Sequence, residues 1–593
     1  MKVKTKTQPG KPKEPLDDAA SAPCYAARRW VVIGLLAVCA TALIARAVER
    51  QVVERDFLQN EGERRFVRTV EMPAHRGVIS DRRGKKLAVS APVVSISVNP
   101  RVLPMDNRQL LPLARVLGMD LGELRRKLAR NSQRAFLYLK RGVQPATAGK
   151  VRELVNELDI DGVDFNREYH RFYPSGEVTA HIVGLTNIDD RGIEGMELAF
   201  DEQLKSEPGR KRVIRDGRRR VVEDIESLGQ PRDGKDLTLS IDRRLQFIAY
   251  RELKAAVERN NAKGGSAVLV DARTGEILAM VNQPSYNPNR ADTARRGAMR
   301  NRAATDVAEP GSTMKPFTVA AALDLGAVAP DAIIDTSPGY FYIGRDRVKD
   351  HNNLKRIDLG TLLAKSSNVG AAKLALGMDK QVFHDYLAAL GLGRATGAGY
   401  PGEVRGRLAD ARRWRRIDQA TLSFGYGISV TPIQLAAAYS VFAADGVKRP
   451  LTLLKREDSV AGVRVMKAET ARRVRGMLEA VAKKGGTAPQ AAIPGYRVAG
   501  KTGTARKVVD GKYSTKRYVA LFAGMAPARD PRYVMVVEID EPRGKYYYGG
   551  AVAAPVFSKV MAETLRLMNV APDMPALDDA PTLRLAASGE VAR

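Results

Sequence analysis

The chain contains very little cysteine and histidine, and this scarcity excludes several kinds of site. Only two cysteines occur in 593 residues, Cys24 and Cys39, and both lie near the N-terminus. No disulfide framework can therefore form beyond residue 40, and an oxidising compartment would do the chain no harm. The five histidines are scattered, with no His-x-x-x-His or His-Glu pair. We expect neither a zinc site nor a histidine-based catalytic triad.

Acidic residues are also few compared with basic ones. The chain has 67 Asp and Glu against 97 Lys and Arg, a formal net charge of +30. Nucleic acid, anionic membrane or cell-wall polymers, or a solvated Arg-rich surface could each account for this excess. No zinc-finger spacing, RNA-binding signature or helix-turn-helix pattern is present, so we predict no nucleic-acid partner. The length predicts two or three domains, each with a core of its own.

Long apolar runs are rare, and one that contains no charge lies near the N-terminus, from Trp30 to Ala45. Its length is close to the lower limit for a membrane-spanning helix, and Ala47 and Val48 extend it if Arg46 snorkels. The basic residues before it predict a cytoplasmic tail over 1–29, an anchor over 30–48 and export of the rest. A cleaved signal peptide is the alternative, but the basic leader is long for one.

The region from 49 to 235 carries no evident chemistry. Its polar and glycine-rich clusters, at 76–82, 171–176 and 192–197, lack ligand spacing for metal or phosphate and are interpreted as turns and surface ion pairs. A strand is predicted at 93–98, and short amphipathic helices at 108–117, 121–129 and 147–158. A turn at 231–234 marks a domain boundary.

The region from 236 to 568 predicts an α+β domain, in which an antiparallel sheet is covered by helices. Strands are predicted at 237–241, 266–270, 277–281, 498–509, 518–525 and 533–539, and helices at 244–257, 314–325 and 554–568. The final residues, 569–593, are small and polar and are predicted to be a disordered tail.

A serine and a lysine mark the start of the helix predicted from Met314. Ser312 follows Pro310-Gly311, and Lys315 lies one helical turn later on the same face. A serine hydroxyl is a poor nucleophile without an adjacent base, and a desolvated lysine can serve as that base. A surface serine and lysine on an ordinary helix is the alternative, yet this is the only Ser-x-x-Lys in the chain.

Two further motifs follow in the chain. In Lys501-Thr502-Gly503-Thr504, a cation and two hydroxyls flank a glycine that permits close backbone approach, which suits a carboxylate-bearing extended substrate. A hairpin with a solvated lysine is the alternative. Ser366 and Asn368 form a weak Ser-x-Asn pattern, suited to proton relay and to holding a peptide group, although a helix N-cap is a simpler reading.

The segment Gly495–Thr502 also matches the phosphate-loop pattern G-x-x-x-x-G-K-T. Such a loop must follow a strand and open a helix, whereas here β-branched residues follow and end in the turn Asp510-Gly511. We therefore predict that no nucleotide binds at this segment.

In their order along the chain, the three motifs resemble those of penicillin-binding proteins and class A β-lactamases. With the blocks around them, the chain resembles a class B penicillin-binding protein of the division-specific type, from about Arg76 to Met568. The supporting blocks are Arg76-Gly-x-Ile-x-Asp-Arg, Tyr-Pro-Ser-Gly-Glu-Val-Thr-Ala-His181, Gly-Ile-Glu-Gly195, Pro-Ser-Tyr-Asn-Pro288, Phe-Gly-Tyr-Gly427 and Tyr-Tyr-Tyr-Gly-Gly-Ala-Val552.

The resemblance implies an inner-membrane anchor with a cytoplasmic N-terminus, a pedestal domain of the dimerisation type (49–235) and a periplasmic transpeptidase domain (236–568). It implies D,D-transpeptidation of peptidoglycan stem peptides at the division septum, within the serine-type D-Ala-D-Ala carboxypeptidase class, and acylation by β-lactams. No cofactor or metal is needed. The implied partners are a membrane glycosyltransferase and other division proteins.

By the same resemblance, each motif residue receives a role. Ser312 is the nucleophile, Lys315 the base and Ser366 the proton relay. Asn368 holds the peptide amide, Lys501, Thr502 and Thr504 bind the terminal carboxylate beside Gly503, and the backbone N–H groups of Ser312 and Thr504 hold the oxyanion.

Two other functions share these motifs. The first is hydrolysis, by a carboxypeptidase or a β-lactamase, but the class A deacylation signature Glu-x-x-Leu-Asn is absent. The second is a β-lactam sensor or division scaffold. Intact serine, lysine and Lys-Thr-Gly motifs argue against a dead enzyme, although sensors can keep them.

Overall fold

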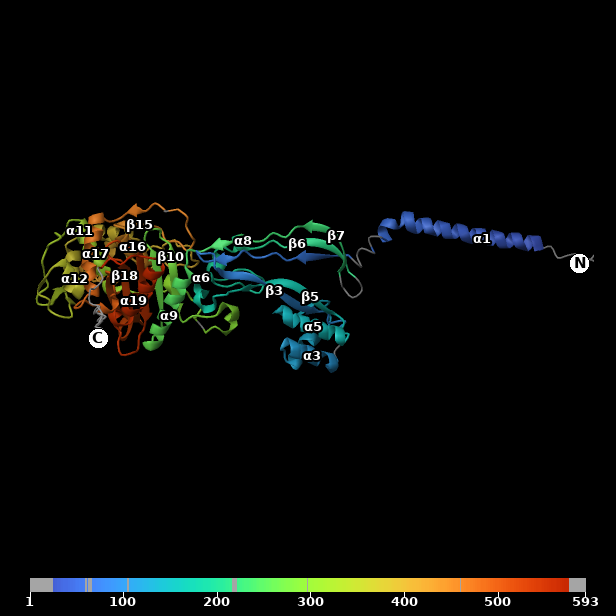
Figure 1. Cartoon of the computed structure of the whole chain (residues 1–593), viewed down its shortest axis with the longest axis horizontal. Coiled ribbons are helices and arrows are strands. Elements are labelled where there is room, and N and C mark those ends of the chain that lie inside the picture. Colours follow the sequence, from blue (N-terminus) through green and yellow to red (C-terminus); the bar gives the residue numbers. More distant parts are fainter. Residues whose placement is uncertain are drawn as a thin grey trace, which may run out of the picture. The chain divides into compact units, whose positions relative to one another are not determined.

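The computed structural model describes residues 25–58, 61, 67–103, 106–215, 221–295, 297–458 and 460–574 (Figure 1). Residues 1–24 of the predicted cytoplasmic tail are not among the described residues. Residues 575–593 of the predicted disordered tail are not among them either. The chain forms two compact units. The first comprises 1–71 and 210–229, and the second comprises 72–209 and 230–593.

The first unit contains the apolar helix α1 (Tyr25–Val48), which a π-helical turn, Glu49–Val53, continues. The segment Ala26–Val53 is the one helix among the described residues that is long and apolar enough to cross a membrane, and its side chains from Ala26 to Val48 are all exposed. At 1.5 Å per residue its 28 residues exceed the thickness of about 30 Å of a bilayer core. This unit also holds a three-stranded sheet in the order β1 (Val67–Met72), β6 (Gly209–Arg215), β7 (Val221–Gly229).

The pedestal part of the second unit is built on the long strand β3 (Lys86–Val98), which pairs antiparallel with β4 (Leu137–Val143) and β5 (Val163–Phe172). The strand predicted at 93–98 is therefore confirmed but is longer. All three predicted helices are present, and together with these strands they enclose a separate hydrophobic core: α3 (Asn107–Leu117), α4 (Leu121–Arg130) and α5 (Pro145–Glu157).

The interpretation of the pedestal clusters as surface ion pairs is wrong for Arg76, Arg171 and Glu197. Their side chains are fully buried, and the Glu197 carboxylate accepts from Arg76 Nε at 2.7 Å and from Arg171 Nε at 2.6 Å. Arg76 also reaches Asp201 at 2.8 Å. The sequence could not show this cluster, because Glu197 lies 121 residues after Arg76 and only the fold brings them together.

The transpeptidase part of the second unit has a five-stranded antiparallel sheet, which confirms the predicted fold class. Its order is β10 (Ile277–Gln283), β9 (Gly264–Asp271), β19 (Tyr533–Asp540), β18 (Lys512–Ala526), β17 (Ala499–Val509). Helices cover its two faces, α9 (Arg243–Arg259) with α19 (Ala554–Leu567), and α16 (Pro432–Ala443) with α17 (Ala468–Ala482) (Figure 1). Because β17 is the edge strand, its outer side remains available to an extended ligand.

The two parts of the second unit share one hydrophobic core. Ile79 and Leu87 of the pedestal belong to the same buried cluster as Leu237 and Leu269. The short strands β2 (Ile79–Ser80) and β8 (Leu237–Thr238) pair in parallel across the predicted boundary at 235, so the core continues from one part into the other.

Candidate active site

Ser312 lies in a short 3₁₀ helix, Gly311–Met314, that leads directly into α11 (Lys315–Asp324). Gly311 makes the turn into this helix with a φ of 53°, a left-handed conformation that glycine adopts without strain. The Tyr439 hydroxyl donates to the Thr313 carbonyl at 2.8 Å, and Phe317 packs against the Tyr439 ring. The serine is thus held at the start of a buried helix, two residues before Met314, at which the sequence predicted that helix to begin.

The Lys315 amine lies at the centre of the three predicted motifs. It is 3.0 Å from Ser312 Oγ, 3.0 Å from Ser366 Oγ and 2.8 Å from Asn368 Oδ1, and it donates to the Ser366 carbonyl at 2.5 Å. Lys315 is fully buried, and this burial lowers its pKa well below the ordinary lysine value. The like charge of Lys501 lowers the pKa further, while Asp350 opposes the shift.

Ser366 and Asn368 are held at a junction of two helices. Ser366 ends α12 (Leu359–Lys365) in a left-handed conformation, with φ 61° and ψ 45°, which is rare for a residue other than glycine. Ser367, and not Ser366, is the N-cap of α13 (Asn368–Leu376), and its hydroxyl accepts from the Gly370 N–H. The capping role that the sequence left open therefore belongs to the neighbouring serine, and Ser366 is free to face Lys315.

Lys501 approaches the same serine from β17. Its amine lies 3.1 Å from Ser366 Oγ, and burial lowers its pKa to about 7. Because residues 499–509 form a strand, no helix opens after Gly495–Thr502, as a phosphate loop requires.

Gly503 allows β17 to pack directly against the segment Pro310–Thr313, which carries Ser312. A β-carbon at this position would lie 2.7 Å from the Pro310 carbonyl oxygen and 3.0 Å from the Thr313 methyl group. The sequence predicted that another chain segment or a ligand approaches the backbone closely at Gly503. In the structure, this neighbour is the protein's own segment around Pro310.

The motif residues open into a cleft of about 630 Å³, which Ser312, Ser366, Asn368, Thr502 and Thr504 line. Its outer wall is rich in tyrosine: Tyr426, Tyr513, Tyr518, Tyr547 and Tyr548. The structure thus brings every predicted site residue together. Some of these residues line the cleft, and the buried Lys315 and Lys501 lie beneath it, in contact with Ser366. Among the described residues, no group of three or more His, Cys, Asp or Glu side chains is placed to hold a metal ion.

Asp350 is a site residue that the motifs did not indicate. Its carboxylate accepts hydrogen bonds from the Ser367 hydroxyl at 2.6 Å, from the Val369 N–H at 3.0 Å and from the Asn368 N–H. It follows a short hairpin, β12 (Tyr340–Ile343) and β13 (Asp346–Lys349), and caps the start of α13 from outside that helix. An isolated aspartate after a hairpin carries no motif, so only the fold reveals its place.

The Thr487 hydroxyl was also missed. It lies 2.9 Å from the Thr502 hydroxyl and extends the polar edge of the cleft.

Comparison with known families agrees with this geometry. Residues 265–562 match the penicillin-binding protein transpeptidase domain, and residues 71–239 match the penicillin-binding protein dimerisation domain. The chain belongs to the penicillin-binding protein family, with a dimerisation domain followed by a transpeptidase domain.

Individual relatives cover nearly the whole chain. It is 43% identical over 581 residues to the peptidoglycan D,D-transpeptidase FtsI of Escherichia coli K12, covering 97% of this chain and 96% of that one. It is 38% identical over 536 residues to FtsI of Buchnera aphidicola, covering 90% and 93%.

Two solved structures are similar as well. The transpeptidase domain of Burkholderia pseudomallei penicillin-binding protein 3 is 46% identical, with a TM-score of 0.53, and covers 57% of this chain and 98% of that one. A peptidoglycan synthetase from Bifidobacterium adolescentis is 26% identical, with a TM-score of 0.67, and covers 86% and 98%.

Proposed function

We propose that the protein is a peptidoglycan D,D-transpeptidase that cross-links stem peptides at the division septum through a serine acyl-enzyme, and that β-lactams acylate the same serine. The observation that carries this proposal is the position of the buried Lys315 amine, 3.0 Å from both Ser312 Oγ and Ser366 Oγ. The family membership and the names of the relatives support the reaction class.

In the first step, Ser312 Oγ attacks the carbonyl between two D-alanines of the donor peptide. The neutral Lys315 amine accepts the serine proton, and the low pKa that burial produces keeps this amine neutral. The backbone N–H groups of Ser312 and Thr504 stabilise the oxyanion. Their proximity supports this role, since a β-carbon on Gly311 would lie 3.5 Å from the Thr504 nitrogen.

The C–N bond then breaks and the terminal D-alanine leaves as an amine. Ser366 lies between Lys315 and Lys501, at 3.0 and 3.1 Å, and passes the proton to this leaving group. The terminal carboxylate of the donor is bound by Lys501, Thr502 and Thr504 at the edge of β17, and Asn368 holds the peptide amide. An amine of a second stem then attacks the acyl-enzyme, its proton returns to Ser312, and the cross-link is released.

The protein is proposed to be a single-pass inner-membrane protein with its N-terminus in the cytoplasm and its catalytic part in the periplasm. The exposed apolar surface of α1 supports the anchor. A membrane glycosyltransferase and other division proteins are the proposed partners of the anchor and the pedestal. Carboxypeptidase activity, in which water replaces the acceptor amine, is proposed as a side reaction of the same acyl-enzyme.

Labelled penicillin tests the proposal directly. Membranes containing the full chain are incubated with the label, and the modified peptide is mapped by mass spectrometry. We expect a single acylated residue, Ser312, in a protein that still carries the α1 segment. Acylation of Ser366 or any other serine would overturn the assignment, and a mature N-terminus at Val48 would show that α1 is a cleaved signal.

A further inference from the structure

The hairpin formed by β17 and β18 extends beyond the central sheet, toward the catalytic cleft. The pairing of β18 with β19 begins at Val519, whereas its pairing with β17 continues to Val509 and Lys512. Residues 508–513, here called the hairpin tip, therefore form a two-stranded ribbon. Because such a ribbon is only marginally stable by itself, contacts outside the sheet are needed to hold the tip in place.

Tyr513 connects the hairpin tip to two other segments of the cleft wall. Its hydroxyl donates to Glu309 Oε1 at 3.0 Å, and its ring packs edge-on against the ring of Tyr426, with the ring centroids 5.5 Å apart. Both tyrosines line the cleft. Burial and the Glu309 carboxylate raise the pKa of Tyr513, so its hydroxyl keeps its proton and remains a donor.

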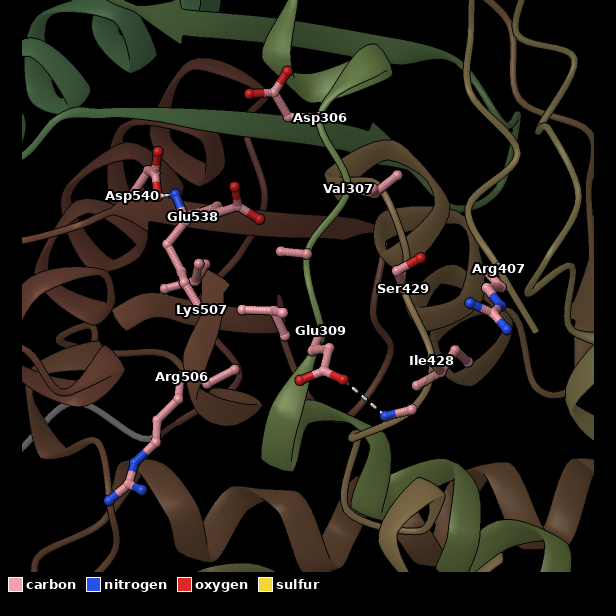
Figure 2. A pocket seen from close by; sticks show the side chains of 15 residues that line it. Asp306, Val307, Glu309, Arg407, Ile428, Ser429, Arg506, Lys507, Glu538 and Asp540 are labelled. Carbon is pink, nitrogen blue, oxygen red and sulfur yellow. Dashed lines mark hydrogen bonds and ion pairs between the residues drawn. The ribbon is translucent and has the colours of Figure 1, made fainter. Parts of the chain in front are cut away.

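Glu309 joins these segments through one oxygen atom. It lies three residues before Ser312, and its Oε1 also accepts from the Gly427 N–H at 2.8 Å, the bond that the dashed line at Glu309 marks in Figure 2. The side chain borders a cavity of about 350 Å³, whose lining also includes Arg506 and Glu538 (Figure 2). Glu309 thus receives one donor from the turn 425–427 and one from the hairpin tip.

The turn 425–427 is itself packed against the 3₁₀ helix that carries the nucleophile. The Gly311 N–H donates to the Gly425 carbonyl at 3.2 Å, and a β-carbon on Gly425 would lie 2.1 Å from the Gly311 carbonyl oxygen. The hairpin tip is more open to solvent, since Tyr513 is 47% exposed and Val508 is 54% exposed. We therefore expect the tip to be the part that moves when its bond to Glu309 is lost.

We propose that Glu309 is a positioning residue, which holds Tyr513 and the hairpin tip against the cleft and so shapes the wall that the acyl portion of the donor contacts. The role of the donor rests on the proposed function, whereas the attachment of the tip does not. With the tip held, the rings of Tyr426 and Tyr513 form a preformed wall. Without that bond, binding must first order the tip, which weakens affinity. The chemical step at Ser312 does not use the tip and should be unchanged.

The first test measures acylation by benzylpenicillin, using the full chain in detergent with Ser312 intact. Tyr513→Phe removes one hydroxyl and keeps the ring, and Glu309→Ala removes the carboxylate. Both should raise the concentration that gives the half-maximal acylation rate about fivefold or more. Tyr513→Phe should leave the maximal rate within about twofold of the wild type. Tyr546→Phe alters an exposed tyrosine that does not line the cleft, and as the matched control it should change neither quantity.

Glu309→Gln separates the hydrogen bonds from the charge. Its amide oxygen can accept from both donors, and an amide nitrogen in place of Oε2 breaks no bond, because Oε2 has no hydrogen-bond partner among the described residues. This variant should behave like the wild type. Equal losses in Glu309→Gln and Glu309→Ala, with Tyr513→Phe unchanged, would overturn the proposal, because the carboxylate would then act by its charge and not by holding the tip.

A smaller compound distinguishes the wall from the nucleophile. 6-Aminopenicillanic acid lacks the acyl side chain of benzylpenicillin and has little to place against the tyrosine rings. Its half-maximal concentration should therefore stay nearly constant in Tyr513→Phe. An equal rise for both compounds would show that the tip acts on the segment that carries Ser312, and would overturn the assignment of the wall.

Hydrogen exchange examines the hairpin tip without any acylation. The amides of residues 508–513 should exchange about threefold faster or more in Tyr513→Phe and Glu309→Ala than in the wild type, and at the wild-type rate in Tyr546→Phe. Unchanged exchange in the first two variants would overturn the proposal. If benzylpenicillin fails to acylate Ser312 in the wild type, the proposed function fails, while the exchange result still decides whether Glu309 holds the tip.

Discussion

Two groups of buried charged side chains in the second compact unit, one in the pedestal and one in the candidate active site, have different kinds of partner. In the pedestal, the guanidinium groups of Arg76 and Arg171 share the carboxylate of Glu197 between them. In the candidate active site, Lys315 and Lys501 are both buried, yet among the described residues each amine contacts only hydroxyl, amide and carbonyl oxygens.

This difference changes what the charges can do. A buried ion pair keeps its groups ionised, because each charge stabilises the other. Two buried lysines without a carboxylate in contact instead lose protons easily, and the pKa of each falls. We therefore expect the pedestal cluster to contribute to structure, and the lysine pair to supply the base proposed above. Four predictions test this contrast.

The largest effect is expected from Ser312→Ala. The hydroxyl is the only atom removed, so covalent labelling by penicillin should be lost completely. The melting temperature should stay close to that of the wild type, because the serine is only partly buried and no core contact is lost. Labelling that survives in a folded variant would show that the nucleophile is another residue.

The next largest effect, a loss of folding free energy, is expected from a substitution in the pedestal cluster of Arg76, Arg171 and Glu197. Glu197→Gln leaves two buried guanidinium groups without a counter-charge and should cost about 3–5 kcal/mol of folding free energy, measured by denaturant unfolding. Glu207→Gln, which breaks an exposed pair with Arg232, should cost less than about 0.5 kcal/mol. The folded fraction of Glu197→Gln should be acylated at the wild-type rate; a slower rate would contradict a purely structural role.

Removing one lysine of the pair should shift the pH dependence of the acylation rate. The acylation rate of the wild type should rise with pH through the pKa of Lys315, well below the ordinary lysine value. Lys501→Met removes the like charge that lowers this pKa, so the rise should move to higher pH. Lys512→Met, at an exposed position of β18, serves as the control and should leave the profile unchanged. Coinciding profiles for Lys501→Met and wild type would remove Lys501 as a cause of the shift.

Removing the charge of Asp350 should shift the pH dependence of the acylation rate by a smaller amount and in the opposite direction. Its negative charge raises the pKa of Lys315, but less strongly than burial and Lys501 lower it. Asp350→Asn keeps acceptors for the N–H groups at the start of α13 and removes the charge, so the rise in acylation rate should move to lower pH. Asp346→Asn, on the same hairpin but exposed, should have no effect. An unchanged profile would show that Asp350 acts only by holding Ser367 and Asn368.

Much of this organisation could be predicted from the sequence. Residues 498–509 and 533–539 are rich in β-branched and aromatic residues, which indicated strands, and the structure places both segments in one antiparallel sheet. The Ser312, Ser366 and Lys501 motifs were predicted to act together, and Ser366 Oγ lies within hydrogen-bond distance of both the Lys315 and the Lys501 amines. These features are local patterns of residue type, which a sequence displays directly.

What could not be predicted depends on contacts between distant segments. Glu197 looked like a surface acid because its two arginines lie 26 and 121 residues away. Asp350 and Thr487 carry no motif, and they reach the site only through the hairpin before α12 and the loop after α17. Glu538 sits in an apolar strand pattern that gives no sign of the cavity beside it.

The contact between Gly503 and Pro310 has a consequence for the evolution of drug resistance. Every substitution at position 503 adds at least one carbon, and that carbon would collide with backbone that carries the nucleophile. A substitution at this position would therefore have to displace the segment that carries Ser312. Side chains in the wall of the cleft have more room to vary, as at the half-exposed Tyr548. The absence of a single methyl group thus closes position 503 to adaptation, while the wall of the cleft remains open to it.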